Sequence, residues 1–257
     1  METRKVSQEA RTAPVAWITL FGALIGVTAL IPIFPYVGGG GYVPLLVPFA
    51  AIAPLLLGPS GGIAAAVVGG VIGMFLAPAG FPMGLLDVLL TGVLPAVYTA
   101  SIAHLNKNRL LSYLLGVVSA AFAVLFPFYI PGASAGFQAP PEPLYQALSA
   151  IYWLPSLVVI FSPIGTRLIP SLVASEARPR KYAGIFIILL SALWLWFNPW
   201  AKPYWYIQHY VPAAGVATLI GYSWWVPALS AVVTAISVPV LEALSRSGLP
   251  KVRDGLW

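Results

Sequence analysis

The segment MGLLDVLLTGVLPAVYTASIAHL, residues 83–105, decides the fold class. It is almost entirely apolar, with one acid, Asp87, near its start and His104 at its end. About 20 such residues cross the hydrocarbon core of a bilayer as one α-helix. The segment therefore predicts a membrane-spanning helix.

The composition of the whole chain agrees with this prediction. Hydrophobic residues make up 60% of the chain and charged residues 8%, whereas a soluble domain carries about 25% charged residues. The net charge of +6 comes from short loops between apolar runs, so we expect no nucleic-acid partner. We predict an all-α, polytopic transmembrane helical bundle that forms a single domain over residues 1–257.

Working outward from residues 83–105, we expect seven further membrane segments: 14–34, 43–57, 61–77, 110–130, 145–170, 182–197 and 211–244. Residues 198–210 read as an aromatic loop, and residues 221–223 as a break within the last segment. Segments 43–57 and 61–77 are short and joined by a Gly-Pro turn. They form either two tilted crossings or a re-entrant hairpin, and the sequence leaves both open.

The basic residues give the orientation. With residues 1–13 as a cytoplasmic tail, twelve of the thirteen Lys and Arg residues fall on one side, and Lys202 is the exception. Cytoplasmic loops of membrane proteins carry such an excess of Lys and Arg. The sequence therefore predicts a multi-pass plasma-membrane protein whose N- and C-termini are both cytoplasmic.

Motifs for metal-dependent proteolysis and for ATP binding are missing from the sequence. It contains no HExxH or GxxxxGK[ST] motif and no cysteine, and Asp87 is the one acid well inside an apolar segment. We expect no catalytic residues, no metal and no cofactor, and therefore no enzyme. A weaker option is a lipid- or isoprenoid-modifying enzyme that uses Asp87.

Several polar and aromatic residues fall on the predicted outer side, where we expect a ligand pocket. The candidate ligand-binding residues are Asp87, Tyr42, Gln146, Trp205 and Gly40. A buried carboxylate beside aromatic faces suits a small cationic or heteroaromatic solute. The alternative for Asp87 is a cap at the start of its helix. The alternative for the aromatic cluster at 194–225 is a belt at the lipid headgroups.

Small residues four apart let membrane helices approach closely. Gly22 and Gly26 in the first segment form one such pair, and Gly69 and Gly73 form another. They pack helices within the chain or, for Gly22 and Gly26, dock a partner subunit.

Residues 15–105 resemble the start of the substrate-capture (S) component of an energy-coupling-factor vitamin transporter. The resemblance rests on three stretches: 22–26, with Ile31-Pro32-Ile33 after it; 39–44, GGGYVP; and 55–62, LLLGPSGG, followed by small residues at 64–66 and 69–70. It implies a subunit that captures a micronutrient from outside and docks, through Gly22 and Gly26, on a coupling protein with two ATPases. It also implies that the glycine-rich loop covers the solute.

This family usually has six spans in a shorter chain. We therefore regard 15–175 as the S-component-like bundle and 181–257 as a possible extra helix pair. The expected function is a solute-capture subunit of an ATP-driven micronutrient importer. The alternative is a non-catalytic accessory subunit of a larger membrane complex.

Overall fold

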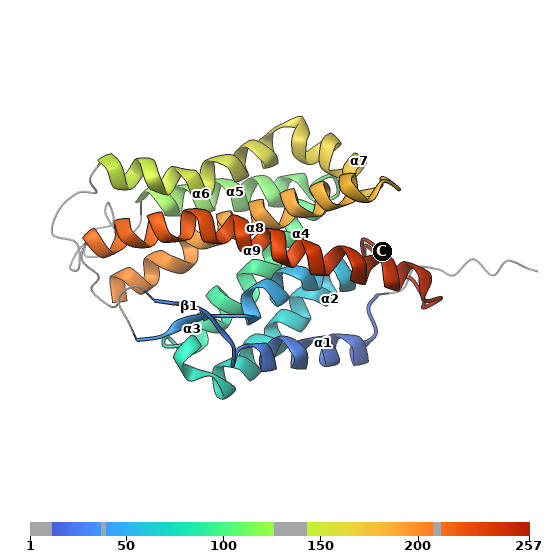
Figure 1. Ribbon diagram of the computed structural model, residues 1–257, viewed down its shortest axis with the longest axis horizontal. Helices are drawn as coiled ribbons and strands as arrows, with labels where there is room; N and C mark the ends of the chain where they lie inside the picture. Colours follow the sequence, from blue (N-terminus) through green and yellow to red (C-terminus); the bar gives the residue numbers. More distant parts are fainter. Residues whose placement is uncertain (1–11, 37–39, 126–142, 208–211) are drawn as a thin grey trace, which may run out of the picture.

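The computed structural model describes residues 12–36, 40–125, 143–207 and 212–257. Helices run roughly parallel to one long axis, and a small two-stranded hairpin lies at one end (Figure 1). The C-terminus and the start of α1 lie at the opposite end, which also carries the basic loops. We call these the hairpin end and the basic end.

Helix α1 (Val15–Thr28) is shorter than the predicted first segment, which extended to residue 34. Pro32 lacks a backbone N–H and disfavours a helical residue before it, so the helix cannot continue through Ile31-Pro32. The chain instead forms β1 (Pro32–Pro35), which pairs antiparallel with β2 (Tyr42–Pro44). The fold is otherwise helical, as the sequence predicts.

Helix α2 (Leu46–Leu76) contains a reversal at Gly58, where the backbone has φ 70° and ψ 170°. A Cβ on Gly62 would overlap the Cα of Pro54, and one on Gly73 would lie 2.9 Å from Cδ1 of Leu46. These contacts place residues 46–57 and 59–76 side by side and antiparallel. The two predicted short segments are therefore the arms of one helical hairpin, whose tip, the Gly58 turn, lies at the basic end.

The segment 83–105 forms one continuous helix of span length, Leu85–Ala103, as predicted. It follows η1 (Pro78–Gly80) and consists of α3 (Leu85–Asp87), η2 (Val88–Val93) and α4 (Leu94–Ala103). The stretch η2 is a π-helix, and Pro95 lies two residues after its end. Pro95 has no N–H to donate to the preceding turn, so the i→i+4 ladder is interrupted at this point.

The second half of the chain forms longer helices. They are α5 (Arg109–Leu125), α6 (Pro143–Phe161), η4 (Ile164–Leu168), α7 (Ile169–Val173), α8 (Arg178–Ile207) and α9 (Pro212–Arg246). Two predictions about this region are wrong. Residues 198–207, predicted as loop, continue α8, and residues 221–223, predicted as a break, lie inside a continuous α9.

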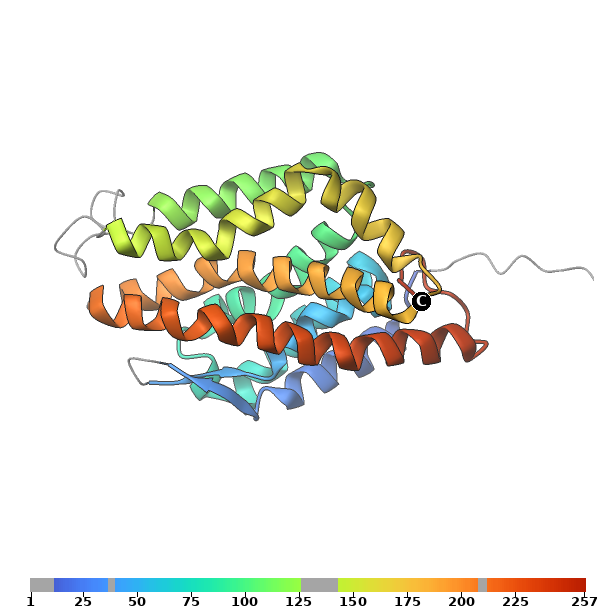
Figure 2. The ribbon, with the colours of Figure 1, turned by 45° about the horizontal axis from the view of Figure 1, so that its top comes forward.

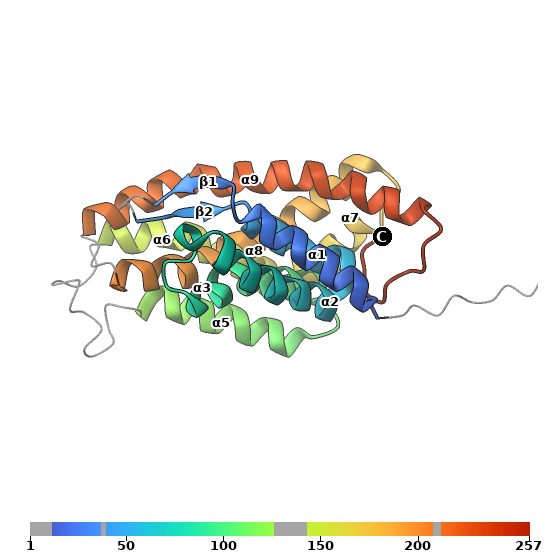
Figure 3. The same cartoon turned by 90° about the horizontal axis from the view of Figure 1, so that it is seen from below.

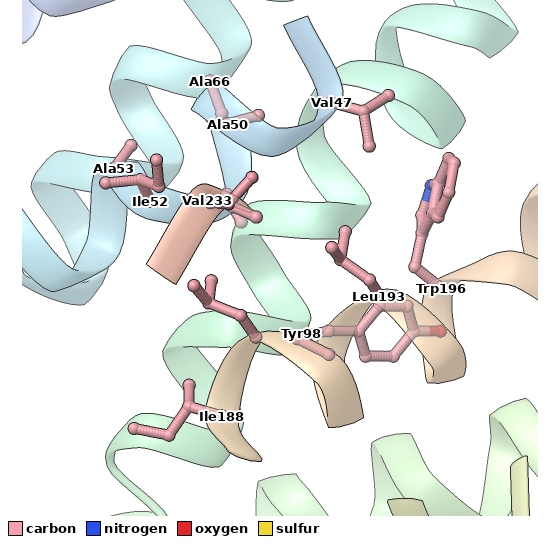
Figure 4. Close-up of a cluster of buried hydrophobic side chains, with 14 of the residues drawn as sticks. Val47, Ala50, Ile52, Ala53, Ala66, Tyr98, Ile188, Leu193, Trp196 and Val233 are labelled. Carbon is pink, nitrogen blue, oxygen red and sulfur yellow. The ribbon is translucent and has the colours of Figure 1, made fainter. Parts of the chain in front are cut away.

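By length and composition, four helices of the described chain could cross a membrane: α2 counted over both arms, residues 85–103, α8 and α9. The bent pair formed by α6 with η4 and α7 makes a fifth candidate. Helices α1 and α5 are apolar but shorter. The core lies where α2, α4, α8 and α9 meet (Figure 4). Its buried side chains include Val47, Ala50, Tyr98, Leu193, Trp196 and Val233.

Candidate functional site

Asp87 lies near the hairpin end, at the entrance to the helix that runs from residue 85 to 103. Its side chain is fully buried, and its Oδ2 accepts a hydrogen bond of 2.6 Å from the backbone N–H of Met83. Gly84, with φ 59°, turns the chain between these two residues. Asp87 therefore closes the turn that leads into its helix, while Gly84 at the N-cap position makes no side-chain cap bond.

A layer of aromatic rings lies close to this turn. The indole N–H of Trp196 donates to the carbonyl of Leu90, three residues after Asp87, at 2.6 Å. The Trp196 ring stacks on Trp200 at 5.0 Å between centroids, and Trp200 in turn lies 5.7 Å from the ring of Tyr36. We call Tyr36, Trp196 and Trp200 the aromatic layer; it joins the β-hairpin to α8 and η2.

The belt interpretation of this cluster is wrong for most of its described tryptophans. Trp196, Trp200 and Trp225 are each at most 9% exposed, so they pack inside the protein and not at lipid headgroups. Trp225 touches Phe34 of β1, with 5.4 Å between ring centroids. Trp224, by contrast, is 64% exposed.

The β1–β2 hairpin lies against the same region (Figure 3). Tyr42 is half-buried and donates its hydroxyl to the carbonyl of Ala29 at 3.1 Å. Gly40 is exposed and has φ 79°, a backbone conformation that favours glycine. Gly41 has room for no side chain, because a Cβ there would overlap the carbonyl oxygen of Ala79 and lie 2.9 Å from Cδ2 of Tyr36. The hairpin therefore seats closely on η1.

Two predicted ligand residues cannot be placed in this site by their side chains. Gln146 falls at the start of α6 and Trp205 in the last turn of α8, and their side chains lie outside the described part of the structure. Asp87 and Tyr42 both lie at the hairpin end, and each hydrogen-bonds backbone of its own chain.

Two hydroxyls on the Asp87 segment were not singled out from the sequence. Thr91 and Thr99 are fully buried, and their Oγ1 atoms have no hydrogen-bond partner among the described residues. They differ from Ser230, Thr234 and Ser237 of α9, whose hydroxyls donate to the carbonyl four residues earlier. The pattern D-x-x-x-T-x₇-T within an apolar run was the signal that could have found them.

Gly22 and Gly26 face α2 and are both buried. A Cβ on Gly22 would lie 2.8 Å from Cβ of Val68, and one on Gly26 would lie 2.6 Å from Cβ of Ile72. Gly69 faces back toward Ile25 in the same way. The two small-residue pairs therefore meet each other inside the chain, and the surface of Gly22 and Gly26 is occupied by α2.

At the basic end, the C-terminal segment Val252–Trp257 packs onto the Gly58 turn; we call it the tail. Pro59 has no N–H to bond the carbonyl of Leu55, and the backbone of Gly58 is not helical. The backbone N–H of Leu256 donates to that carbonyl at 2.8 Å, and the indole N–H of Trp257 donates to the carbonyl of Leu56 at 2.8 Å. The tail therefore caps the first arm of the α2 hairpin, residues 46–57.

Charged groups hold the tail from the other side. Nε2 of His104 lies 2.8 Å from the carbonyl oxygen of Asp254, and the ammonium of Lys107 pairs with the Asp254 carboxylate. The hydrogen bond from Lys107 lowers the pKa of Asp254 below its ordinary value, partial burial opposes it, and the nearby positive charges assist. The backbone of Asp254 is left-handed, with φ 66°.

Two hollows adjoin the tail. One, of about 380 Å³, lies between the tail, the turn after α4 and η4, and is lined by polar groups including His104, Lys107, Lys251 and Asp254. The other, of about 530 Å³, lies between α1, the Gly58 turn of α2 and α9, and is lined by apolar side chains. Neither contains Asp87, Tyr42 or Gly40.

Within the described residues, no three His, Asp or Glu side chains gather as a metal site would require. Comparison with protein-family models, with curated proteins and with solved structures finds no match to this chain.

Proposed function

We propose that the chain is a membrane-embedded solute-capture subunit that binds a small organic solute at the hairpin end. One observation carries the proposal. The β1–β2 hairpin, with a glycine at φ 79° near its tip, packs on Trp200 through Tyr36, at the same end of the molecule as a fully buried carboxylate and opposite the basic loops. Aromatic faces and a carboxylate are the groups that bind a cationic or heteroaromatic solute.

In this proposal the hairpin is the moving part. Trp200 is buried and packs against Tyr36 at the end of β1, so in this proposal a solute reaches the aromatic layer when the hairpin lifts from η1. The hairpin consists of two short strands, and such a pair is marginally stable without other contacts. Its contacts with η1 and Trp200 therefore set how readily it opens.

The proposed orientation places the hairpin end outside and the basic end, with both termini, in the cytoplasm. The positive-inside rule supports it, because Lys107, Arg178, Arg246 and Lys251 all lie at the basic end. Each arm of α2 would then count as one short crossing, which gives the eight segments expected from the sequence.

Energy would come from partner subunits. Asp87 is the one acid well inside an apolar segment, and the sequence has no ATP-binding loop, so a coupling protein with ATPases would drive transport. Since Gly22 and Gly26 are covered by α2, such a partner would meet the outward face of α1 at Val27 and the turn after it at Leu30, which are both about half exposed.

The absence of cysteine allows a direct test of hairpin opening. A Cβ on Gly80 of η1 would lie 3.6 Å from Cβ of Pro44 in β2, which suits a disulfide. In the Pro44→Cys/Gly80→Cys protein, oxidation should slow the binding of the co-purified solute about tenfold or more, and a reductant should restore it. Each single-cysteine variant is the matched control.

The solute itself is identified by native mass spectrometry of the detergent-purified protein. A small molecule bound at about one per chain supports the proposal. Asp87→Asn can still accept the Met83 hydrogen bond, so it should fold and yet bind a cationic solute about tenfold more weakly, a change of about 1.4 kcal/mol. A protein that carries only other subunits, with no solute, would instead be the accessory subunit.

A further inference from the structure

The ring of His104 faces a backbone carbonyl with each of its two nitrogens. His104 follows the last residue of α4 and is 7% exposed. Its Nδ1 lies 3.1 Å from the carbonyl oxygen of Ala100, one turn earlier in α4, and its Nε2 lies 2.8 Å from the carbonyl oxygen of Asp254 in the tail. The tail folds back among the helix ends at the basic end, where the C-terminus lies (Figure 2). The ring therefore joins α4 to the tail.

The protonation state of His104 decides how many of these two contacts are hydrogen bonds. A carbonyl oxygen only accepts, so each contact needs an N–H on the ring. The neutral ring has one N–H, and its other nitrogen then presents a lone pair to a carbonyl oxygen 2.8 or 3.1 Å away. The imidazolium donates to both carbonyls, and hydrogen bonds from a charged donor are about twice as strong as neutral ones. The arrangement is therefore complete only when the ring is protonated.

The charged groups around the ring come from the turn after α4 and from the C-terminal segment. The carboxylate of Asp254 attracts the positive ring, and Lys107 pairs with the same carboxylate. Lys251 lines the hollow beside the ring, and Arg253 adds positive charge to the tail. The residues that η4 and α7 place at this hollow are a glycine and a proline, which do not titrate. Among these side-chain types, histidine is the one that ordinarily changes its charge between about pH 5 and 8.

We propose that His104 is a pH-sensitive latch, which holds the tail on the Gly58 turn when it is protonated and loosens the tail when it is neutral. The protonated ring donates to α4 and to the tail at once. When the ring loses its proton, one of the two contacts becomes repulsive and the other becomes a weaker, neutral bond. The tail is then held by the bonds of Leu256 and Trp257 to α2 and by the Lys107 pair. The latch is independent of the proposed solute site, which lies at the other end of the molecule.

The direction of the pH effect separates the latch from the ion pair between Lys107 and Asp254. That pair lowers the pKa of Asp254 below its ordinary value, so the carboxylate stays charged above about pH 5 and the pair is lost only in acid. The second bond of His104 is lost in the opposite direction, as the pH rises. A tail that loosens between about pH 6 and pH 8 therefore reports His104, whereas a tail that loosens in acid reports the ion pair.

Because the chain has no cysteine, a single introduced thiol can report the opening of the tail. Val252 in the tail is 2% exposed, so a maleimide reaches the thiol of Val252→Cys only when the tail opens. Ser247→Cys, at an exposed position shortly before the tail, corrects for the pH dependence of thiol chemistry itself. The labelling rate of Val252→Cys relative to that of Ser247→Cys should rise about tenfold between about pH 6 and pH 8, because a hydrogen bond from a charged group is lost.

Variants of the two histidines complete the test. The side chain of His104→Gln is never charged, so with this change the relative labelling rate should be high and the same across this pH range. His209→Gln removes the chain's other histidine and should keep the original pH profile. The proposal is overturned by a relative rate that is flat or falls with pH in the protein with both histidines. It is also overturned by a low rate or a persisting pH profile in His104→Gln, or by loss of the profile in His209→Gln.

A second measurement applies if His104→Gln does not fold. The His209→Gln protein contains one histidine, so the ¹⁵N spectrum of its labelled imidazole reports His104 alone. Two protonated ring nitrogens at about pH 6, with loss of one proton as the tail becomes reactive toward maleimide, support the latch. A ring that is neutral at about pH 6, or that loses its proton without any change in labelling, overturns it.

Discussion

Gly58→Ala should be among the most damaging single-methyl changes in this protein. Gly58 has φ 70° and ψ 170°, a region that only glycine occupies without cost, and an alanine there is strained by about 1–3 kcal/mol. Its Cβ would also overlap the carbonyl oxygen of Arg253 in the tail. Because that atom is backbone, the tail must move as a unit.

Displacement of the tail adds a second cost. It breaks the bonds from Leu256 and Trp257 to the carbonyls of Leu55 and Leu56, and each carbonyl left unsatisfied in the interior costs about 1–3 kcal/mol. The total loss of stability should then be about 3 kcal/mol or more. Gly248→Ala is the matched control, because Gly248 has φ 72° but open space around it, so it should lose only about 1–2 kcal/mol.

The assay is thermal unfolding in detergent, followed by tryptophan fluorescence, together with limited trypsin cleavage after Lys251 and Arg253. Gly58→Ala should unfold at a lower temperature than Gly248→Ala and should be cleaved faster within the tail at temperatures where both are folded. If the two variants unfold at the same temperature and their tails are cleaved at the same rate, the tail does not cap the α2 hairpin.

Three further changes test other contacts. Asp254→Asn tolerates the left-handed backbone but loses the charge that pairs with Lys107. Because pairing lowers the pKa of Asp254 in the folded protein, the stability that the pair gives is present at neutral pH and is lost as the pH falls through that pKa. Melting curves of variant and wild type should therefore differ at pH 7 and converge in acid. Trp257→Phe keeps an aromatic ring but leaves the Leu56 carbonyl without its indole donor, and should cost about 1–3 kcal/mol in the same melt, whereas Trp224→Phe at an exposed position should cost nothing measurable. Gly69→Ala should separate α1 from α2, because its Cβ would lie 2.6 Å from Cβ of Ile25, and a melting temperature equal to that of wild type would argue against this packing.

The sequence predicted the helical class of this fold and the end of the molecule that holds the basic residues, because hydrophobic length and charge asymmetry are local properties. It also predicted the reversal at Gly58-Pro59, because the turn preference of Gly-Pro is a local property of the sequence. It placed the end of α1 too late by weighing hydropathy over Pro32, and it read residues 198–207 as loop because Pro199 and Pro203 and the many aromatic residues resemble an interface.

The contacts at the candidate sites depended on tertiary structure. Pro59 implies that the carbonyl of Leu55 needs a donor from elsewhere, but nothing nearby in the sequence indicates that Leu256 supplies it. The burial of Trp196 and Trp200 likewise follows from how α8 packs on η2 and the β-hairpin, which hydropathy alone does not report. For Asp87, the sequence offered a cap and a ligand group as alternatives, and the structure shows a bond from Met83 that closes the turn before the helix.

The bond from Trp257 to Leu56 joins residues 201 positions apart, and this separation has a consequence for biosynthesis. A ribosome that adds about 5–20 residues per second needs about 10–40 s to travel from one to the other. Throughout that interval the newly inserted Gly58 bend has two carbonyls without their native donors. The bend is completed only when residues 256 and 257 have been translated and have folded back onto it.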